Sequence, residues 1–247
     1  MKQAMIFAAG LGTRLKPLTD TKPKALVSVG GEPLLRHVVL RLKEAGFERI
    51  VVNVHHFADQ IVDYLRANQH FGLDIRISDE REQLLDTGGG IRKASSLFDA
   101  DSPILIHNVD ILSNIDLAAL YDKAQQTDAL LLVSQRKTQR YLLFDEARRL
   151  VGWTNIATQE VKSPYPRLEV SRYQMLAFSG IHVLHPSMFS QMEGWQAKFG
   201  IIDFYLQQCD HSKIMGYEQP HLRLLDVGKL DSLTEAEHFI SNSSFNQ

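Results

Sequence analysis

Short apolar runs alternate with amphipathic stretches along this chain, and this alternation limits its fold more than any other feature. Unbroken apolar runs of roughly four to eight residues indicate buried strands, whereas apolar side chains three and four positions apart indicate a helix. Helical spacing is clear at 33–45, around 61–65 and after Asp116, a predicted N-cap. Strands that alternate with helices predict an α/β fold, in which a mostly parallel mixed sheet has helices on both faces. The runs that predict strands are "AMIFAA" (4–9), "RIVVNV" (49–54), "LDIRIS" (73–78), "PILIHNVD" (103–110) and "ALLLVS" (129–134).

The pattern changes after Ser134, where short mixed runs with prolines and charges replace the regular alternation. We interpret the segment at about 135–175 as a small lobe or insertion beside the sheet. "MLAFSGIHVLHP" (175–186) then predicts a strand that returns into the main sheet. We expect one domain over 1–240 and a flexible tail at 241–247. The last predicted elements are a helix near 202–208, strands near 213–217 and 221–227, and a closing helix.

The composition excludes several classes of partner. The 27 Lys and Arg residues against 29 Asp and Glu leave no basic excess, so nucleic acid is not an expected partner. The apolar runs are too short to span a bilayer, and the first leads into a Gly-rich turn, unlike a secretory signal. The single cysteine, Cys209, excludes an intrachain disulfide and suits a reducing compartment. We therefore expect a soluble cytoplasmic protein without a membrane partner, and the oligomeric state stays open.

The loop "GLGTRLKPLTDTKPK" follows the first predicted strand and is the strongest candidate for a phosphate site. A dinucleotide fingerprint needs a third glycine where this chain has Leu15, and the Walker pattern is also absent. Gly10 and Gly12 allow the backbone to approach an anion, while Arg14 and Lys24 supply fixed cations. Open parallel sheets bind ligands beyond the carboxyl ends of their strands, which is where this loop lies. The residues predict a cradle for a triphosphate, with a plain Gly-rich turn as the alternative.

This loop and the strand before it resemble those of the sugar-1-phosphate nucleotidyltransferases, the nucleotide-sugar pyrophosphorylase family. The family hallmark is a strand, then G-x-G-T-R-L/M-x-P-L/M-T, then a P-K pair. The resemblance covers most of the chain, least at 135–175, and is strongest to the short bacterial N-acetylmuramate-1-phosphate uridylyltransferases. It implies a Rossmann-like sheet with a small sugar-binding lobe. Further segments in the family's order are "GEPLLRHVVLRLKEAGFERIVVNV", "TGGGIRKA", "NVDILS", "FSGIHVLHP" and "LLDVG".

The resemblance implies transfer of a nucleotidyl group from an NTP to a sugar 1-phosphate, with release of pyrophosphate. The first expectation is UTP with an amino-sugar 1-phosphate such as N-acetylmuramate-1-phosphate. A mannose- or heptose-1-phosphate guanylyltransferase, a phosphocholine cytidylyltransferase and a non-catalytic nucleotide-sugar sensor are the alternatives. By resemblance Arg14 and Lys24 are the catalytic pair, and Asp110 and Asp226 bind Mg²⁺. Mg²⁺ prefers one or two carboxylates and fills its other positions with water and phosphate oxygens.

The resemblance also implies contacts to the base and the sugar. Thr87, Gly88 and Gly89 open a predicted helix, where N–H groups and the helix dipole favour acceptors or anions. Glu80 or Asp86 could accept from uracil N3–H or guanine N1–H, so the base is left open. The implied nucleotide-binding residues are Ala8, Ala9, Gly10, Leu11, Gly12, Thr13, Glu80, Asp86, Thr87 and Gly88, and the implied sugar-binding residues are Asn155, Ser179 and Gly180.

The chain departs from the family pattern at several positions. Val109 stands where the family has Gly before the metal-binding Asp, and Lys229 replaces the Thr of D-V-G-T. Asn155 falls where many relatives place a Glu that binds sugar hydroxyls. A Glu-Lys pair for the sugar phosphate is missing, and Lys162 or Arg167 are the candidates to replace it. These departures motivate the sensor alternative and leave the sugar open.

Overall fold

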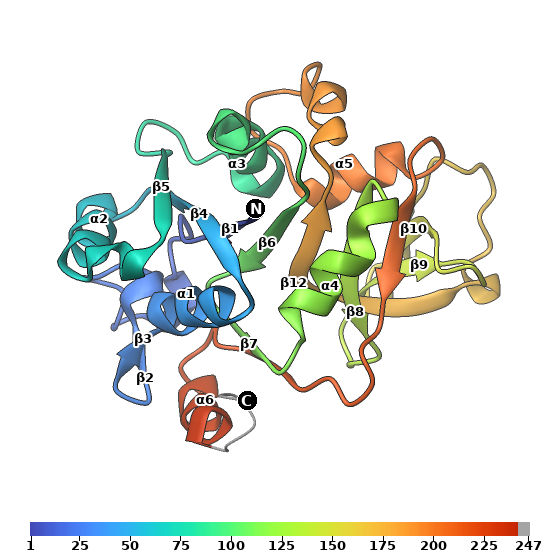
Figure 1. The fold of residues 1–247 in the computed structure, drawn as a ribbon. Coiled ribbons are helices and arrows are strands. Elements are labelled where there is room, and N and C mark those ends of the chain that lie inside the picture. Colours follow the sequence, from blue (N-terminus) through green and yellow to red (C-terminus); the bar gives the residue numbers. More distant parts are fainter. Residues whose placement is uncertain (242–247) are drawn as a thin grey trace.

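A mixed sheet lies between two layers of helices in the computed structural model, which describes residues 1–241 (Figure 1). The strand order is β11-β10-β9-β12-β6-β1-β4-β5, with β8 paired to β12 and β13 paired to β8. The pairs β1–β4, β1–β6, β4–β5 and β8–β13 are parallel, and β12 runs antiparallel to β6 and β8. The predicted α/β architecture and the return strand are therefore confirmed.

Most predicted elements occur within a few residues of their expected ends. The helices are α1 (Leu34–Glu44), α2 (Ala58–Ala67), α3 (Asp86–Ala94), α4 (Leu117–Lys123), α5 (Ile201–Gln208) and α6 (Ser232–Ser241). The strands of the main sheet are β1 (Lys2–Phe7), β4 (Phe47–Val54), β5 (Asp74–Asp79), β6 (Ile104–Asn108), β8 (Ala129–Ser134), β12 (Gln174–Leu184) and β13 (Ile214–Tyr217). Two small ribbons pair β2 (Ser28–Val29) with β3 (Glu32–Pro33), and β7 (Ile111–Ser113) with β14 (Leu224–Asp226).

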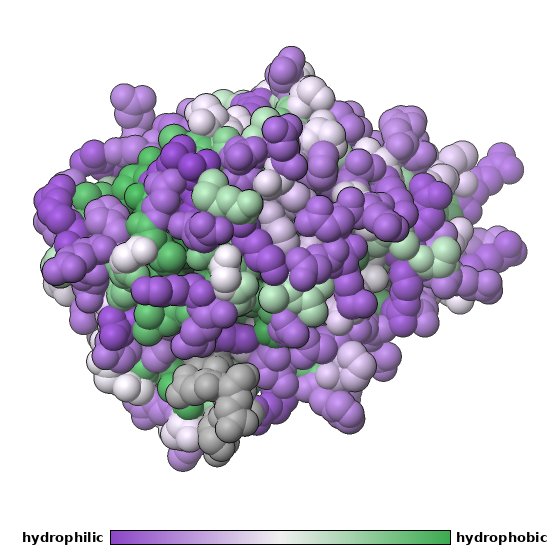
Figure 2. Space-filling view, viewed as in Figure 1, coloured by the Kyte–Doolittle hydropathy of each residue, from purple (hydrophilic) through white to green (hydrophobic). Residues whose placement is uncertain are grey.

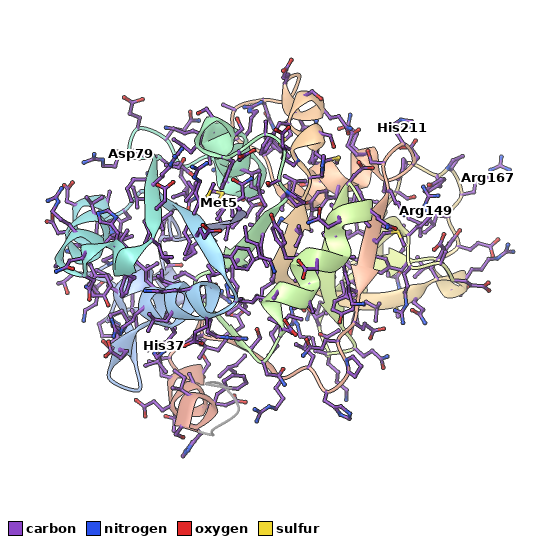
Figure 3. The ribbon with its side chains drawn as sticks, viewed as in Figure 1. Met5, His37, Asp79, Arg149, Arg167 and His211 are labelled. Carbon is purple, nitrogen blue, oxygen red and sulfur yellow. The ribbon has the colours of Figure 1, made fainter. Side chains whose placement is uncertain are left out.

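Both faces of the sheet are buried, which explains why its strands are unbroken apolar runs. On β1, Ala4 and Ile6 pack into one core with α1, α2 and α4. Met5, between them, packs into a second core with α3 and α5 and lies inside the molecule in Figure 3. Because successive side chains point to opposite faces, Ala4, Met5 and Ile6 alternate between the two cores.

The segment expected to form a small lobe extends the main sheet. β9 (Arg140–Phe144), β10 (Leu150–Asn155) and β11 (Glu160–Lys162) are antiparallel neighbours. They join the sheet through the first residues of β12, Gln174–Leu176, which pair with β9. Periodicity did not identify β11 because it has only three residues and all of them are exposed at the sheet edge.

Two predicted strand ends were wrong, and both errors affect where candidate site residues lie. β1 ends at Phe7, so Ala8 and Ala9 belong to the following loop. β6 ends at Asn108, and the chain turns at 109–110 into β7, so Asp110 lies in a turn. Ser241, expected to begin the tail, is the last residue of α6, and the rest of the predicted tail lies outside the described residues.

The face in Figure 2 is mostly hydrophilic, with apolar residues in small separate groups. Within residues 1–241, no helix combines the length and the hydropathy that crossing a membrane requires.

His182 on β12 is a buried polar group inside the second core. Its ring lies 5.5 Å from the Phe178 ring and 5.6 Å from the Tyr205 ring, measured between centroids. Neither ring nitrogen has a hydrogen-bond partner among the described residues. Burial lowers the pKa of His182 to about 3, and burial likewise lowers the pKa of His107 to about 4. Both imidazoles are therefore neutral in the folded protein at neutral pH.

We expect His182→Phe to make folding less sensitive to acid. In the unfolded chain a histidine has a pKa near 6.5, so unfolding takes up protons once the pH falls below about 6.5. Stability is thus lost as the pH falls from about 6.5 toward the folded pKa, and His182 accounts for about 2 kcal/mol of that loss at pH 5. Urea unfolding at pH 7 and pH 5 should show a loss smaller by about this amount in His182→Phe. The exposed His238 supplies a control, His238→Gln, and equal losses in the wild type and His182→Phe would contradict the assignment.

Candidate functional site

A cavity of about 380 Å³ lies at the carboxyl ends of β1, β4 and β6, where ligands bind in open α/β sheets. It brings eight of the residues predicted from the sequence into one place: Ala8, Ala9, Gly10, Lys24, Glu80, Asp86, Thr87 and Asp110. The other residues that line it are Phe7, Asn53, Leu84, Asn108, Val109 and Lys198. Leu11, Thr13 and Arg14 are exposed beside it and do not line it.

The loop after β1 is held in a fixed shape. Gly12 has φ 65°, and a Cβ there would lie 2.9 Å from Cγ2 of Thr19 and 3.1 Å from Cβ of Lys24. The Thr19 hydroxyl donates to the Gly12 carbonyl at 2.8 Å, and Leu15 anchors the short helical turn Thr13–Leu15 in the core. Only glycine combines this conformation with this close approach. The loop therefore places Lys24 at the cavity wall.

Asp110 and Asp226, far apart in the sequence, are joined by backbone pairing. The N–H of Val227 donates to the carbonyl of Asp110 at 2.8 Å. β14 pairs with β7 so that Asp226 lies opposite Ile111, the residue after Asp110. The Lys24 ammonium forms an ion pair with the Asp110 carboxylate, and the two side chains are only 12% and 16% exposed.

The side chain of Arg14, in the loop after β1, lies near Asp226. A Cβ built on Gly228 would lie 2.6 Å from Oδ1 of Asp226 and 2.8 Å from Nη2 of Arg14. The guanidinium of Arg14 and the carboxylate of Asp226 therefore both lie against Gly228. Two cations and two carboxylates therefore lie close together at the cavity, and their roles as catalytic pair and metal ligands stay predictions.

These two carboxylates suit a divalent cation whose remaining ligands come from water and substrate. Asp110 already accepts a cation, the ammonium of Lys24, and Asp226 is exposed beside it. In the described part of the chain, no group of three or more His, Cys, Asp or Glu could hold a metal ion. A Mg²⁺ ion bound by two carboxylates takes its remaining ligands from water and phosphate oxygens, so the donors present suffice.

Glu80 supports the backbone that lines the cavity. It is fully buried, its Oε1 accepts from the Asn53 amide at 2.7 Å, and its Oε2 accepts from the Leu85 N–H at 3.1 Å. Oδ1 of Asn53 in turn accepts the N–H groups of Ala8 at 2.8 Å and Ala9 at 3.3 Å. Both Glu80 oxygens therefore hold neighbouring groups, and Glu80 fixes Asn53 and, through Asn53, the Ala8–Ala9 backbone. Asn53 was not anticipated, although a lone amide in the apolar run "RIVVNV" was a signal.

We expect Glu80→Ala to lower both stability and nucleotide affinity. The change leaves the Asn53 amide and the Leu85 N–H buried without an acceptor, at roughly 1–3 kcal/mol for each group. Urea unfolding should show a loss of about 3 kcal/mol, and KM for the NTP should rise because the Ala8–Ala9 backbone loses its support. Glu82→Ala, two residues away on the surface, is the matched control. An unchanged unfolding free energy in Glu80→Ala would show that this network does not support the site.

The glycines that open α3 pack closely instead of facing a ligand. Gly88 and Gly89 donate their N–H groups to the carbonyl of Phe199 at 2.9 and 3.2 Å. A Cβ on Gly88 would lie 2.2 Å from the Phe199 ring. The acceptor for these N–H groups is therefore a backbone carbonyl of the protein itself, and the nucleotide-binding role of Gly88 stays a prediction. Asp86 and Thr87, the two residues directly before Gly88, do line the cavity.

Ser179 and Gly180, two of the residues expected to contact a sugar, do not line this cavity but lie next to Asn108, which does. Gly180 has φ 75°, and a Cβ there would lie 2.7 Å from Nδ2 of Asn108. Ser179 is buried, and its hydroxyl has no partner among residues 1–241. Both lie in a part of β12 where the pairing register with β8 shifts, between Phe178 and His182. This bulge presents the Ser179–Gly180 backbone beside the cavity.

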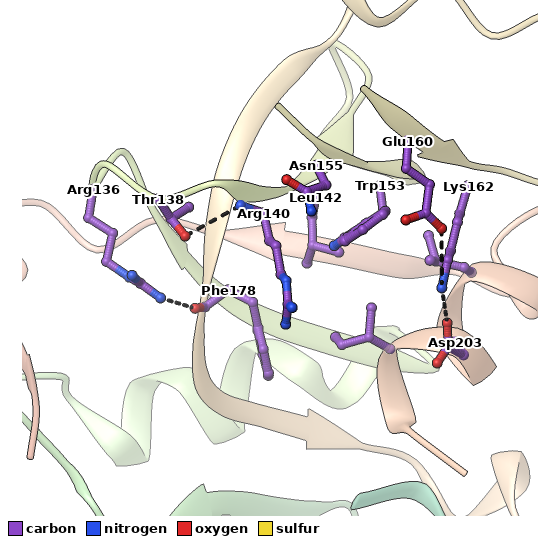
Figure 4. A pocket seen from close by; sticks show the side chains of 12 residues that line it. Arg136, Thr138, Arg140, Leu142, Trp153, Asn155, Glu160, Lys162, Phe178 and Asp203 are labelled. Atoms are coloured by element: carbon purple, nitrogen blue, oxygen red, sulfur yellow. Dashed lines mark hydrogen bonds and ion pairs between the residues drawn. The ribbon is translucent and has the colours of Figure 1, made fainter. Parts of the chain in front are cut away.

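Asn155 lines a second cavity, of about 520 Å³, under the lobe strands (Figure 4). Lys162 lines it too, whereas Arg167 points outward at the end of the lobe in Figure 3. Of the two candidates for the missing Glu-Lys pair, only Lys162 therefore lies in a cavity.

Val109 and Lys229, two departures from the family pattern, leave the gathered charges in place. Val109 is buried, and its N–H donates to the carbonyl of Phe7 at 3.2 Å, which fixes the turn that carries Asp110. Lys229 is exposed, and its carbonyl accepts from the hydroxyl of Ser232 at 2.7 Å, at the start of α6.

Comparison with known proteins gives consistent matches. A model of the nucleotidyl transferase family matches residues 3–243. The N-acetylmuramate alpha-1-phosphate uridylyltransferase of Neisseria meningitidis is 34% identical over 95% of this chain and 96% of its own length. A protein of the same name from Caulobacter vibrioides is 45% identical over 54% of this chain and 58% of its own length. HddC from Yersinia pseudotuberculosis, solved with GMP-PN, is 20% identical and covers 98% of this chain and 100% of its own, with a TM-score of 0.78, a likeness of fold.

Proposed function

The chain belongs to the nucleotidyl transferase family, and on this premise we propose that it transfers a uridylyl group from UTP to an amino-sugar 1-phosphate. N-acetylmuramate-1-phosphate is the acceptor we favour, and the products are a UDP-sugar and pyrophosphate. Support for this substrate comes from the Neisseria relative, whose match extends over nearly the full length of both chains. The observation that carries the reaction type is the gathering of Lys24, Arg14, Asp110 and Asp226 at the end of β1.

The reaction is an in-line displacement at phosphorus. An oxygen of the sugar phosphate forms a bond to the α-phosphorus of the NTP as the bond to the departing pyrophosphate breaks. Lys24, at the cavity wall, would bind the α-phosphate and the incoming sugar phosphate and so bring two anions together. Arg14, outside the cavity, would bind the β- and γ-phosphates as they leave, because its planar fork suits phosphate oxygens. No covalent intermediate on the protein is required.

Asp110 and Asp226 would hold Mg²⁺, which supplies positive charge to the phosphate oxygens when it is bound. If Asp110 bound the metal ion, its ion pair with Lys24 would weaken, and the Lys24 ammonium would be free to bind substrate. These two carboxylates are the residues on which we base the metal requirement.

The base would rest against the Ala8–Gly10 backbone, with Asp86 and Thr87 as the side chains nearest to its polar edge. Asp86 can accept from uracil N3–H or from guanine N1–H, so guanylyl transfer to a mannose or heptose 1-phosphate is the second candidate. Cytidylyl transfer to phosphocholine and nucleotide-sugar sensing without turnover are weaker alternatives. Because both proposed substrates are phosphorylated metabolites, we place the reaction in the cytoplasm.

The test is pyrophosphate release from UTP, GTP, CTP and dTTP, each paired with a panel of sugar 1-phosphates and phosphocholine, with and without Mg²⁺. Metal-dependent release from UTP with N-acetylmuramate-1-phosphate is the expected result. Release from another pair would replace the substrates but keep the reaction. No release from any pair, with an NDP-sugar still raising Tm, would favour the sensor.

A further inference from the structure

The lobe cavity has a cationic character that the phosphate chemistry does not use. Arg136, Arg140 and Lys162 line it, together with the aromatic side chains of Trp153 and Phe178 (Figure 4). Two acidic side chains, Glu160 and Asp203, also line it, which leaves an excess of one positive charge.

This cavity is next to the one at the end of β1. Phe178 lines the lobe cavity, and two residues later Gly180 packs against Asn108, which lines the first cavity. Ile202 lines the lobe cavity, and the N–H of the preceding residue, Ile201, donates at 2.9 Å to the hydroxyl of Thr87, which lines the first cavity. A sugar phosphate whose phosphate lies beside Lys24 would therefore have its ring substituents in the lobe cavity.

The positive charge in this cavity is unevenly compensated. The Lys162 ammonium lies 3.0 Å from Oδ1 of Asp203 and 4.0 Å from Oε1 of Glu160, so its charge is balanced. Arg136 donates to the carbonyl of Phe178 at 3.0 Å, a neutral acceptor that leaves the guanidinium charge uncompensated.

Arg140 has no side-chain hydrogen bond or ion pair to any residue that the structure describes. Arg140 is on β9, and its side chain extends into the cavity between Phe178 and Trp153 (Figure 4). A planar guanidinium that enters a cavity and pairs with neither of the two carboxylates lining it is suited to a bidentate anionic ligand.

We propose that Arg140, aided by Arg136, binds a carboxylate on the sugar, so that the lobe selects acidic sugar phosphates. This inference rests on the proposed function and names the class of acceptor for the same reaction. Trp153 and Phe178 offer apolar surface to the ring and its acyl groups, while Arg140 fixes the acid. N-acetylmuramate-1-phosphate carries such an acid in its lactyl ether. N-acetylglucosamine-1-phosphate is otherwise identical and lacks it.

The experiment compares these two sugar phosphates, with UTP held saturating, in the wild type, Arg140→Ala and Arg140→Lys. The wild type should prefer the acidic sugar, and Arg140→Ala should lose about tenfold to a hundredfold of kcat/KM for it, mainly through KM. Activity on N-acetylglucosamine-1-phosphate should stay unchanged, and Arg140→Lys should recover part of the loss. Arg172→Ala is the control, because Arg172 is exposed, pairs with Glu169 at 2.6 Å and does not line this cavity.

Each result separates this inference from the proposed function. Equal losses on both sugars, or no loss on the acidic one, would overturn the role of Arg140 and leave the transferase reaction intact. If the wild type turns over neither sugar, isothermal titration calorimetry of the same two compounds measures their binding and so tests the role of Arg140 independently of the reaction. Tighter binding of the acidic sugar that Arg140→Ala abolishes would support it, and equal binding would overturn it.

Discussion

Asp110→Asn should lower turnover by about a thousandfold or more while the protein stays folded. The substitution removes the negative charge that pairs with Lys24 and that, in the proposed reaction, holds Mg²⁺ beside Asp226. Removing one preorganised charged group from a phosphoryl-transfer site has effects of this order. The fold should survive because the N–H of Val227 bonds the backbone carbonyl of residue 110, which the change leaves in place.

Initial rates of pyrophosphate release, measured with saturating UTP and sugar phosphate over a range of Mg²⁺ concentrations, check this expectation. Asp63→Asn is the matched control, because that carboxylate is 70% exposed on α2. Turnover in Asp110→Asn above about a tenth of the wild-type rate would be too high for a metal ligand. A loss that high Mg²⁺ reverses would instead indicate weakened metal binding at an otherwise competent site.

Lys24→Ala should reduce kcat by about 10²–10³-fold, and this is the second large effect we expect. The ammonium is held at the cavity wall by the loop after β1 and is only 12% exposed, so solvent cannot replace its charge. Stabilisation of the transition state should suffer more than ground-state binding, because charge accumulates on the α-phosphate only as the bond breaks. We therefore expect kcat to fall more than KM rises.

Lys22→Ala supplies the control, since Lys22 is an exposed residue of the same loop. If Lys22→Ala and Lys24→Ala lose equal activity, the effect of Lys24 is only general electrostatic attraction, and its assigned role is wrong. The double variant Lys24→Ala with Asp110→Asn should lose less than the product of the two single losses, because the two side chains contact each other.

The predicted fold followed from local pattern because the central strands are buried on both faces. Ala4, Met5 and Ile6 must all be apolar when alternate side chains fill two different cores. The lobe strands could not be predicted in this way. β11 is exposed at all three positions, so its partners, and not its own hydrophobicity, make it a strand.

The sequence by itself determined the shape of the loop that we propose to bind phosphate, because the constraints on that loop are local. The positive φ of Gly12 and its contact with Thr19 involve residues only seven apart, and the family pattern identifies both cations. The tertiary structure decided the rest of the site. The bonds from Asn53 to Ala8 and to Glu80 depend on the register of three parallel strands, which no local pattern encodes. Likewise, Phe199 reaches Gly88 only after the chain has crossed the sheet and returned, so packing over long sequence separations set the role of these glycines.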